Sequence, residues 1–302
     1  MKQRISNIQK IYKEGVRLLA DAGIEEADID AWYLLEHVLD ITRAAYYAHP
    51  DLELNTEQEE AYFSLIRKRT QRIPLQHITG EQEFMGYPFY VNGHVLIPRQ
   101  DTELLVEEAL KVLSHGIRIL DMCTGSGCIL ISLLKAGREK RHIEGLYGTG
   151  MDISQEALHV AECNARRLLG GGGPEEGAGS VRFCRGDLFE NAEGRYDLIV
   201  SNPPYIRTQD IEKLQREVRC HDPFIALDGR EDGLHYYRRI TAESTAHITE
   251  GGYLLFETGH DQAEDVCALL EQAGYRGIFV KKDLAGLDRV VGGSYNRTYT
   301  GQ

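Results

Sequence analysis

One short motif has residue types that could activate a nitrogen atom: Asn202, Pro203, Pro204 and Tyr205, directly after the apolar segment DLIVS. Two consecutive prolines end a strand and fix φ at both positions. Such a turn can direct the Asn202 side-chain oxygen and the Pro203 carbonyl at one NH₂ group, with the ring of Tyr205 beside it. The lone pair of a planar amide or amine is delocalised, and two fixed acceptors favour the geometry in which it can attack a methyl group in line. We therefore predict nitrogen methylation, with Asn202, Pro203 and Tyr205 catalytic and residues 202–205 binding the substrate.

A glycine-rich turn at residues 121–127 lies between the apolar segment IRIL and the helix-like segment CILISLL. Its glycines let the backbone approach a ligand, and the N–H groups at the start of the next helix attract negative charge. A tight turn needed only for packing would show the same glycines. With an acidic residue at the strand end and two alternating glycines, the turn resembles the AdoMet-binding loop of class I methyltransferases. That resemblance implies that S-adenosyl-L-methionine (AdoMet) contacts Asp121, Cys123, Thr124, Gly125, Ser126 and Gly127.

Two more strand ends carry acidic residues. Asp152 ends the segment YGTGMD, where a carboxylate can accept both hydroxyls of a ribose because it offers two oxygens. An Asp that caps the next helix is the alternative interpretation. Asp187 and Leu188 end the third strand, at positions that contact adenine in similar folds, although a simple turn would have the same residues. We expect all three to bind the cofactor.

The elements that must position these residues fall into three parts. Residues 1–75 contain apolar residues at helical spacing and no strand-like run, which predicts a small helical bundle; its third helix begins at Thr56, with Glu59 completing a capping box. Residues 76–98 contain Asn92 and Gly93 between apolar runs, a typical hairpin signal, and are predicted to form a β-hairpin linker.

Residues 99–302 alternate strand and helix patterns, as in a mostly parallel sheet with helices on both faces. The last two strands are too close for a helical crossover, so they should be antiparallel. We predict an α/β fold: a Rossmann-like, seven-stranded methyltransferase domain with an antiparallel last strand, preceded by the helical bundle and the hairpin. Strands are expected at 117–123, 146–152, 181–184, 196–201, 253–257, 277–282 and 289–292, and helices at 102–113, 128–136, 154–169, 234–248 and 261–273.

An ordered series of motifs resembles the peptide chain release factor glutamine methyltransferases of the PrmC/HemK type. The series comprises PLQHITG at 74–80, IPRQDTE at 97–103, the 121–127 loop, the 202–205 turn and DLAGLDR at 283–289. The resemblance implies methylation of the side-chain nitrogen (N5) of the glutamine in the Gly-Gly-Gln motif of release factors. AdoMet would be converted to S-adenosyl-L-homocysteine, contacting residues 123–127, Asp152, Leu188 and Asn202, and the helical domain would bind the protein substrate.

Two residues depart from this family pattern. Cys123 stands where the family usually has glycine, and Gln100 where it commonly has proline. If position 123 needs a positive φ, the cysteine should weaken cofactor binding. Arg99 could contact the substrate, contact the cofactor carboxylate, or form a surface salt bridge.

Composition restricts the remaining possibilities. The net charge of −13 argues against a protein that binds DNA by neutralising phosphates. Six scattered cysteines without a CxxC pair indicate reduced thiols, and no signal peptide or membrane span is evident, so we expect a cytoplasmic protein without a metal site. The basic residues Arg67, Lys68, Arg69 and Arg72 are interpreted as a solvated face, with contact to the release factor or ribosomal RNA as the alternative. Other candidates are a ribosomal protein glutamine methyltransferase, a DNA adenine N6-methyltransferase and a non-catalytic AdoMet-binding protein.

Overall fold

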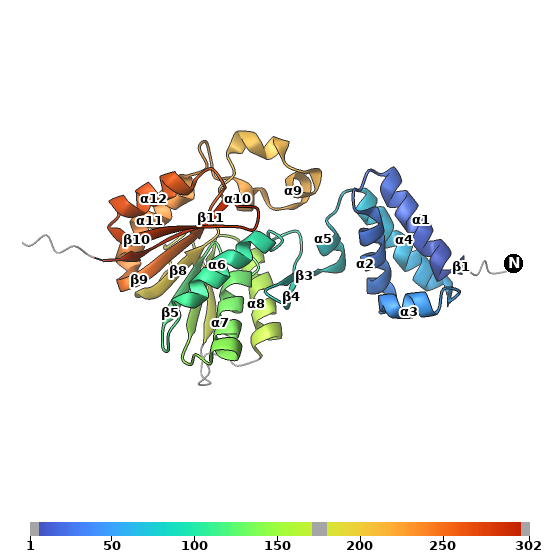
Figure 1. Ribbon diagram of the computed structural model, residues 1–302, viewed down its shortest axis with the longest axis horizontal. Helices are drawn as coiled ribbons and strands as arrows, with labels where there is room; N and C mark the ends of the chain where they lie inside the picture. Colours follow the sequence, from blue (N-terminus) through green and yellow to red (C-terminus); the bar gives the residue numbers. More distant parts are fainter. Residues whose placement is uncertain (1–5, 171–179, 297–302) are drawn as a thin grey trace, which may run out of the picture. The chain divides into compact units, whose positions relative to one another are not determined.

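The computed structural model describes residues 6–170 and 180–296, and the chain forms two compact units (Figure 1). Unit one comprises Met1–Gly80 together with Gln215–His221, and unit two comprises Glu81–Leu214 with Asp222–Gln302. The sequence instead suggested divisions at 75 and 98. The helical unit extends to Gly80 because Leu75 and Ile78 of the next helix pack against its core. A segment from the middle of the larger unit, residues 215–221, also joins it, which periodicity within the first 75 residues could not reveal.

Unit one is helical, as predicted. It contains α1 (Ile8–Asp21), α2 (Ala27–Leu39), α3 (Arg43–Ala48), α4 (Thr56–Thr70), α5 (Leu75–Thr79) and α9 (Arg216–His221), with a short antiparallel pair of β1 (Ser6–Asn7) and β2 (Glu53–Leu54). The capping box of α4 lies one residue earlier than predicted. Asn55 is the cap: its side chain accepts from the Gln58 N–H at 2.8 Å, and the Gln58 side chain accepts from the Asn55 N–H. The Asn55 backbone is extended, as an N-cap requires, so the helix begins with Thr56 already inside it.

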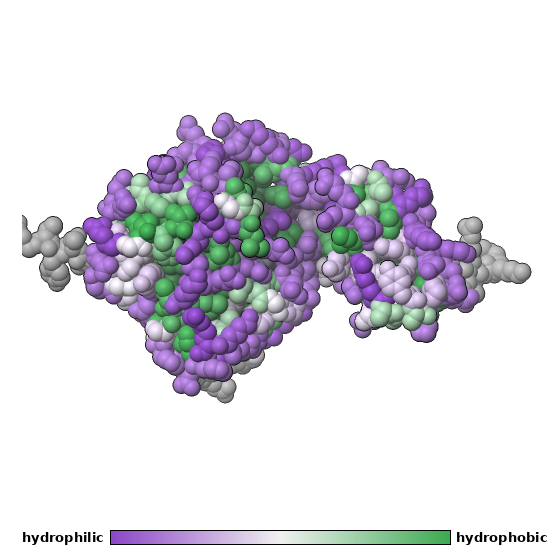
Figure 2. Space-filling model, in the orientation of Figure 1, coloured by the Kyte–Doolittle hydropathy of each residue, from purple (hydrophilic) through white to green (hydrophobic). Residues whose placement is uncertain are grey.

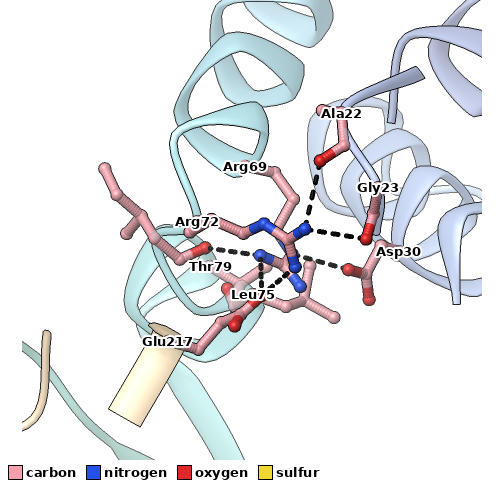
Figure 3. A network of polar contacts seen from close by, with 9 residues as sticks. Ala22, Gly23, Asp30, Arg69, Arg72, Leu75, Thr79 and Glu217 are labelled. Carbon is pink, nitrogen blue, oxygen red and sulfur yellow. Dashed lines mark hydrogen bonds and ion pairs between the residues drawn. The ribbon is translucent and has the colours of Figure 1, made fainter. Parts of the chain in front are cut away.

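The interpretation of the basic run on α4 as a solvated face is wrong for two of its four residues. Arg69 continues the core-facing stripe of Tyr62 and Ile66 at helical spacing and is only 8% exposed. Its guanidinium donates to Asp30 at 2.6 Å and to Glu217 of α9 at 3.1 Å (Figure 3). Arg72 donates to the same Glu217 oxygen at 3.1 Å. Buried ions need such partners, so this network explains why residues 215–221 belong to the helical unit.

Unit two is a seven-stranded sheet with strand order β10-β11-β9-β8-β5-β6-β7. Strands β5, β6, β7, β8 and β9 are parallel, and β11 is antiparallel to both β9 and β10, as predicted for the last pair. The strands are β5 (Arg118–Met122), β6 (Tyr147–Asp152), β7 (Val181–Arg185), β8 (Tyr196–Ser201), β9 (Ile248–Glu257), β10 (Tyr275–Lys282) and β11 (Asp288–Tyr295). The helices are α6 (Gln100–Lys111), α7 (Cys128–Arg141), α8 (Gln155–Leu169), α10 (Phe224–Leu227), α11 (His235–His247) and α12 (Ala263–Gln272), with a 3-10 helix η1 (Thr208–Lys213).

Two apolar cores cover the two faces of this sheet. Side chains of α6, α7 and α8 pack with Ile119 of β5 and Leu198 of β8, whereas side chains of α11 and α12 pack with their neighbours Leu120 and Ile199 (Figure 1). Successive strand residues point to opposite faces, so both faces of the central strands are buried. The outer surface drawn in Figure 2 is mostly hydrophilic, with scattered apolar patches.

The order of the strands brings the predicted site residues to one place. The chain runs outward from β5 through β6 to β7 and then returns to β8 on the other side of β5. Ligands of open α/β sheets bind at such a switch point, beyond the carboxyl ends of the strands. The register pairs Met122 with Met151 and with Ser201, and Ser201 with Phe256, so the ends of β5, β6, β8 and β9 lie side by side.

The β-hairpin forms, but its predicted turn at Asn92 and Gly93 is wrong. Strands β3 (Glu81–Phe84) and β4 (Tyr87–Tyr90) are joined by Met85 and Gly86, with φ of +55° and +80°. Both central residues thus have the positive φ of a hairpin turn. The Asn92 side chain instead accepts from the His94 N–H at 2.9 Å, which closes an Asx turn. Because the residues after this turn form no strand, Asn92 and Gly93 have no second strand to join.

Other predictions bear on individual segments. The glycine-rich composition of residues 170–180 predicts a flexible surface loop, and residues 171–179 lie outside the described residues. All six cysteines are free thiols. Within residues 6–170 and 180–296, no helix is both long enough and apolar enough to cross a membrane.

Candidate active site

A cleft opens in unit two at the carboxyl ends of the parallel strands. Its empty space, counted out to the open mouth, is about 980 Å³. Nine of the thirteen predicted site residues line it: Cys123, Thr124, Gly125, Ser126, Asp152, Asp187, Leu188, Asn202 and Pro204. Asp121, Gly127, Pro203 and Tyr205 do not line the cleft but directly adjoin residues that do.

The two glycines of the 121–127 loop have different structural roles. Gly125 has a φ of +54° and no atom within 4 Å of the place a Cβ would occupy, so its backbone faces open space in the cleft wall. Gly127 has a φ of +77°, and a Cβ there would lie 2.9 Å from Ile131 and 3.1 Å from Ala161. Gly125 therefore leaves room for a ligand, whereas Gly127 lets α7 and α8 pack closely. The local sequence predicted the turn but could not separate these two roles.

Asp121 stabilises the 121–127 loop from the protein interior. It is fully buried, and one carboxylate oxygen accepts from the Thr124 hydroxyl at 2.6 Å and from the Leu130 N–H at 3.3 Å. Burial raises its pKa to about 7, against the lowering effect of those hydrogen bonds. With no exposed surface, Asp121 acts on any ligand through the loop that it holds.

Cys123 occupies the backbone region that the sequence analysis identified as unfavourable. Its φ is +62°, in the left-handed region that favours glycine, and its side chain lines the cleft. Burial and the nearby carboxylates raise the pKa of its thiol, so it is protonated at neutral pH. The cysteine therefore strains the loop that surrounds the cleft without adding a reactive thiolate.

Replacing Cys123 with glycine should relieve this strain. We expect the free energy of unfolding to rise by about 1 kcal/mol, the cost of a left-handed residue that carries a Cβ. For a unit of this size, that corresponds to about 2–4 °C in the unfolding midpoint measured by calorimetry. The matched control is Cys184→Gly in β7, where the backbone is extended and glycine should lower the midpoint instead. A lower midpoint for Cys123→Gly would contradict the strain.

Asp152 forms a turn before α8 and also lines the cleft. Its two carboxylate oxygens accept from the N–H groups of Gly125 and Ser154, each at 2.9 Å, so it holds the glycine-rich loop and begins the turn into α8. It also lies in the cleft wall, and burial raises its pKa against these backbone hydrogen bonds. Each oxygen retains a second lone pair for a ligand hydroxyl.

The adjoining wall contains the other two predicted residues. Asp187 accepts two hydrogen bonds from Arg239, at 3.0 and 3.1 Å. Leu188 is buried and has a φ of +52°. Both residues thus belong to a turn that lines the cleft, and binding of the cofactor by them stays a prediction.

The 202–205 turn begins immediately after β8. Ser201 donates to the Met122 carbonyl of β5 at 2.7 Å, which ties the start of the turn to the strand that carries the glycine-rich loop. Asn202 and Pro204 line the cleft, and both prolines are buried. Tyr205 is half-buried and does not line the cleft, and burial raises the pKa of its phenol.

Several residues that support this turn were missed by sequence reasoning. Gln262, which is 2% exposed, donates to the Tyr205 carbonyl at 3.0 Å. A Cβ on Gly229 would lie 2.7 Å from the Tyr205 backbone, and one on Gly233 would lie 2.5 Å from its carbonyl oxygen. The glycines stand in the segment DGREDG, a turn signal that could have been noticed, but nothing in it indicated Tyr205 as the neighbour.

The Asn202 amide has partners of its own. Its Nδ2 donates to the Thr102 hydroxyl at 3.3 Å, from the first turn of α6. Glu257, the last residue of β9, is 2% exposed. Burial raises its pKa to about 7, opposed by hydrogen bonds from the Thr102 and Asn202 side chains and by the charge of Arg289. Thr102 belongs to the IPRQDTE motif, but no sequence pattern distinguished Glu257.

Arg99 and Gln100 mark the entry to α6. Arg99 lines the cleft and donates to Asp222 at 2.8 Å, so it is both a salt-bridge residue and a wall residue. Burial raises the pKa of Asp222 to about 6, opposed by Arg99. Gln100 is the exposed first residue of α6, a position where proline is favoured but not required. In the described part of the chain, no three His, Cys, Asp or Glu side chains are grouped as metal ligands would be.

Comparisons with known proteins identify domains in both units. Residues 10–80 match the family described as PrmC N-terminal domain, and residues 99–219 match the methyltransferase small domain. A crystal structure of a methyltransferase from Pyrococcus furiosus shares the fold, with a TM-score of 0.52 at 16% identity over 76% of this chain and 98% of that one.

Curated relatives match nearly the whole chain. The release factor glutamine methyltransferase of Geobacter sulfurreducens is 41% identical over 293 residues, which cover 97% of this chain and 98% of that protein. The protein of the same name from Clostridium acetobutylicum is 39% identical over 267 residues, covering 87% and 89%. Similarity of this extent spans both units, and the chain belongs to the release factor glutamine methyltransferase family.

Proposed function

We propose that this protein transfers a methyl group from AdoMet to the side-chain amide nitrogen (N5) of the glutamine in the Gly-Gly-Gln motif of peptide chain release factors, and so modulates translation termination. One observation carries the proposal: the glycine-rich loop and the 202–205 turn, which are far apart in the chain, form one continuous cleft wall. The names of the relatives support the substrate.

The cleft residues fit AdoMet as the methyl donor. Gly125 leaves open space beside the loop, and the Asp152 carboxylate has lone pairs left for two ribose hydroxyls. Cys123, Thr124, Ser126, Asp187, Leu188 and Asn202 complete the proposed binding wall, with Asp121 and Gly127 shaping it from behind. When bound, AdoMet supplies an electrophilic methyl group on a sulfonium; the product is S-adenosyl-L-homocysteine.

The chain's own contribution to the chemistry is orientation. The Asn202 Oδ1 and the Pro203 carbonyl accept the two N–H bonds of the glutamine amide, and Pro204 and Tyr205 hold the turn in shape. Two acceptors fix the amide nitrogen with its lone pair facing the methyl group, and they stabilise the positive charge that develops on the nitrogen. The methylated amide then loses one proton to water, so no general base is needed.

The alternatives are less well supported. A DNA adenine methyltransferase would share the 202–205 turn, but the net charge of −13 disfavours stable DNA binding. A ribosomal protein as substrate, or AdoMet binding without catalysis, finds no support in the relatives' names. With a release factor as substrate, we also expect the protein to work in the cytoplasm. We further propose that unit one binds this protein substrate.

The test is to incubate the protein with a purified release factor and isotope-labelled AdoMet, and then to map the modified residue by mass spectrometry. We expect one methyl group, on the Gly-Gly-Gln glutamine. The same release factor with alanine in place of that glutamine is the control and should remain unlabelled. Label on any other residue, or no label with intact binding of AdoMet, would refute the assignment.

A further inference from the structure

The side-chain amide of Asn202 is held by residues from two other elements. Its Nδ2 donates to the hydroxyl of Thr102, which is itself only 2% exposed. The β8 and β9 register pairs Ser201 with Phe256, so the next residues, Asn202 and Glu257, leave adjacent strand ends. The NH₂ end of the amide is thus directed toward the Thr102 hydroxyl of α6, with Glu257 at the neighbouring strand end.

The direction of this amide matters because its two ends have opposite hydrogen-bonding character. The oxygen accepts and the NH₂ group donates, although the two ends have nearly the same shape. In the proposed reaction, Asn202 must accept an N–H bond of the substrate. If the Asn202 amide were turned by 180°, its NH₂ group would face the NH₂ group of the substrate. The site therefore needs neighbouring groups that select one orientation of the Asn202 amide.

Glu257 and Thr102 are suited to that selection together: a Thr102 hydroxyl that donates its proton to Glu257 has only lone pairs left for Asn202, so it accepts from the NH₂ end. An ionised carboxylate only accepts hydrogen bonds, so it favours the NH₂ end of Asn202 over the oxygen end. Glu257 Oε2 is buried and has no hydrogen-bond partner within the described residues, which leaves acceptor capacity at this point. A buried carboxylate oxygen that accepts no hydrogen bond lowers the stability of the folded protein.

Glu257, with a pKa of about 7, is partly ionised at neutral pH, and the positive charge of Arg289 favours the ionised form against burial and the charge of Asp101. The Arg289 carbonyl of β11 accepts from the N–H of Thr258, the residue after Glu257, at 2.8 Å. The Arg289 guanidinium is fixed by Asp283 at 2.9 Å and by Asp101 at 3.2 Å. The DLAGLDR motif at 283–289, which the proposed chemistry does not otherwise use, thereby gains a role: it holds a cation beside the carboxylate that faces Asn202.

We propose that Thr102 and Glu257 are positioning residues that lock the Asn202 amide with its oxygen toward the substrate. The inference rests on the proposed methyl transfer at Asn202 and adds the residues that orient the Asn202 side chain. These residues act through Asn202, so their loss should slow the chemical step without weakening the binding of AdoMet or of the release factor.

The experiment compares Thr102→Val, Thr102→Ser and Glu257→Gln with the unchanged protein, using a release factor substrate. Thr102→Val keeps the shape but removes the hydroxyl, and we expect kcat to fall about tenfold, the effect of one hydrogen bond. Glu257→Gln replaces the acceptor-only group and should lower kcat by at least as much. KM for the release factor and Kd for AdoMet, measured by calorimetry, should stay unchanged. Thr102→Ser retains the hydroxyl and should restore most of kcat.

The matched control is Thr241→Val, a threonine of α11 that is also 2% exposed and whose hydroxyl has no hydrogen-bond partner within the described residues. It should leave kcat unchanged. The positioning role is wrong if Thr102→Val turns over normally, if Thr102→Ser is as slow as Thr102→Val, or if AdoMet affinity falls in step with kcat. Absence of glutamine methylation by the unchanged protein would instead refute the proposed function, so the two failures are distinct.

Discussion

Replacement of Asn202 by alanine is expected to lower kcat for release factor methylation by about a hundredfold to a thousandfold, the usual effect of removing one fixed hydrogen-bonding group from a transition state. The side chain lies in the cleft wall at the end of β8, and alanine removes the acceptor that would hold the glutamine amide. The backbone carbonyl of Pro203 would remain, so the turn should keep part of its shape. Initial rates with labelled AdoMet measure the effect.

The same variant should retain most of its AdoMet affinity, because the loop and Asp152 that line the cofactor side of the cleft are unchanged. Calorimetric titration with AdoMet checks this. Asn191→Ala is the matched control: Asn191 is exposed and only donates to the Arg185 carbonyl, so its loss should not affect turnover. Normal turnover by Asn202→Ala would eliminate Asn202 as the acceptor.

Replacement of Asp152 by alanine should have the opposite profile and weaken AdoMet binding by at least about a hundredfold. Hydrogen bonds to a charged acceptor contribute about 1.5–3 kcal/mol each, and the proposed ribose contacts comprise two. Alanine also removes the acceptor of the Gly125 and Ser154 N–H groups at 2.9 Å, so the loop itself would loosen. The dissociation constant from calorimetry is the readout.

At saturating AdoMet, Asp152→Ala should recover kcat to within about tenfold, because no proposed contact to the glutamine amide is lost. Asp265→Ala, an exposed aspartate on α12, should bind AdoMet normally and serves as the control. Unchanged affinity in Asp152→Ala would show that this carboxylate only caps the turn into α8, the alternative left open by the sequence.

Binding and chemistry are thus assigned to different strand ends of one sheet. The β5 and β6 ends carry the glycine-rich loop and Asp152, and the β8 and β9 ends carry Asn202 and Glu257. Cys123 has the same positive φ as the loop glycines, so the proposed cofactor-binding loop contains backbone strain, which Cys123→Gly tests. The proposed methyl transfer at Asn202 depends instead on the direction of a hydrogen bond, which Thr102→Val tests.

The sequence by itself determined most of the local structure and the class of chemistry, although the hairpin turn lies at Met85 and Gly86 rather than at Asn92 and Gly93. Apolar periodicity and turn residues are local properties, so the helical first unit, the alternation of strands and helices and the antiparallel last strand pair were predictable. The Asn202 turn was also readable, because consecutive prolines after an apolar strand restrict the backbone whatever surrounds them.

The tertiary structure alone decided which distant residues meet. Thr102 and Asn202 are 100 positions apart, and their contact depends on the order of strands in the sheet, which no local pattern encodes. The sequence predicted that Arg69 is exposed to solvent. In the structure its guanidinium is buried beside Asp30 and Glu217, and Glu217 belongs to the distant segment 215–221. Turn chemistry and periodicity specify elements within a few residues, whereas the partner of a buried polar group is selected by packing between elements, where an unpaired group is costly.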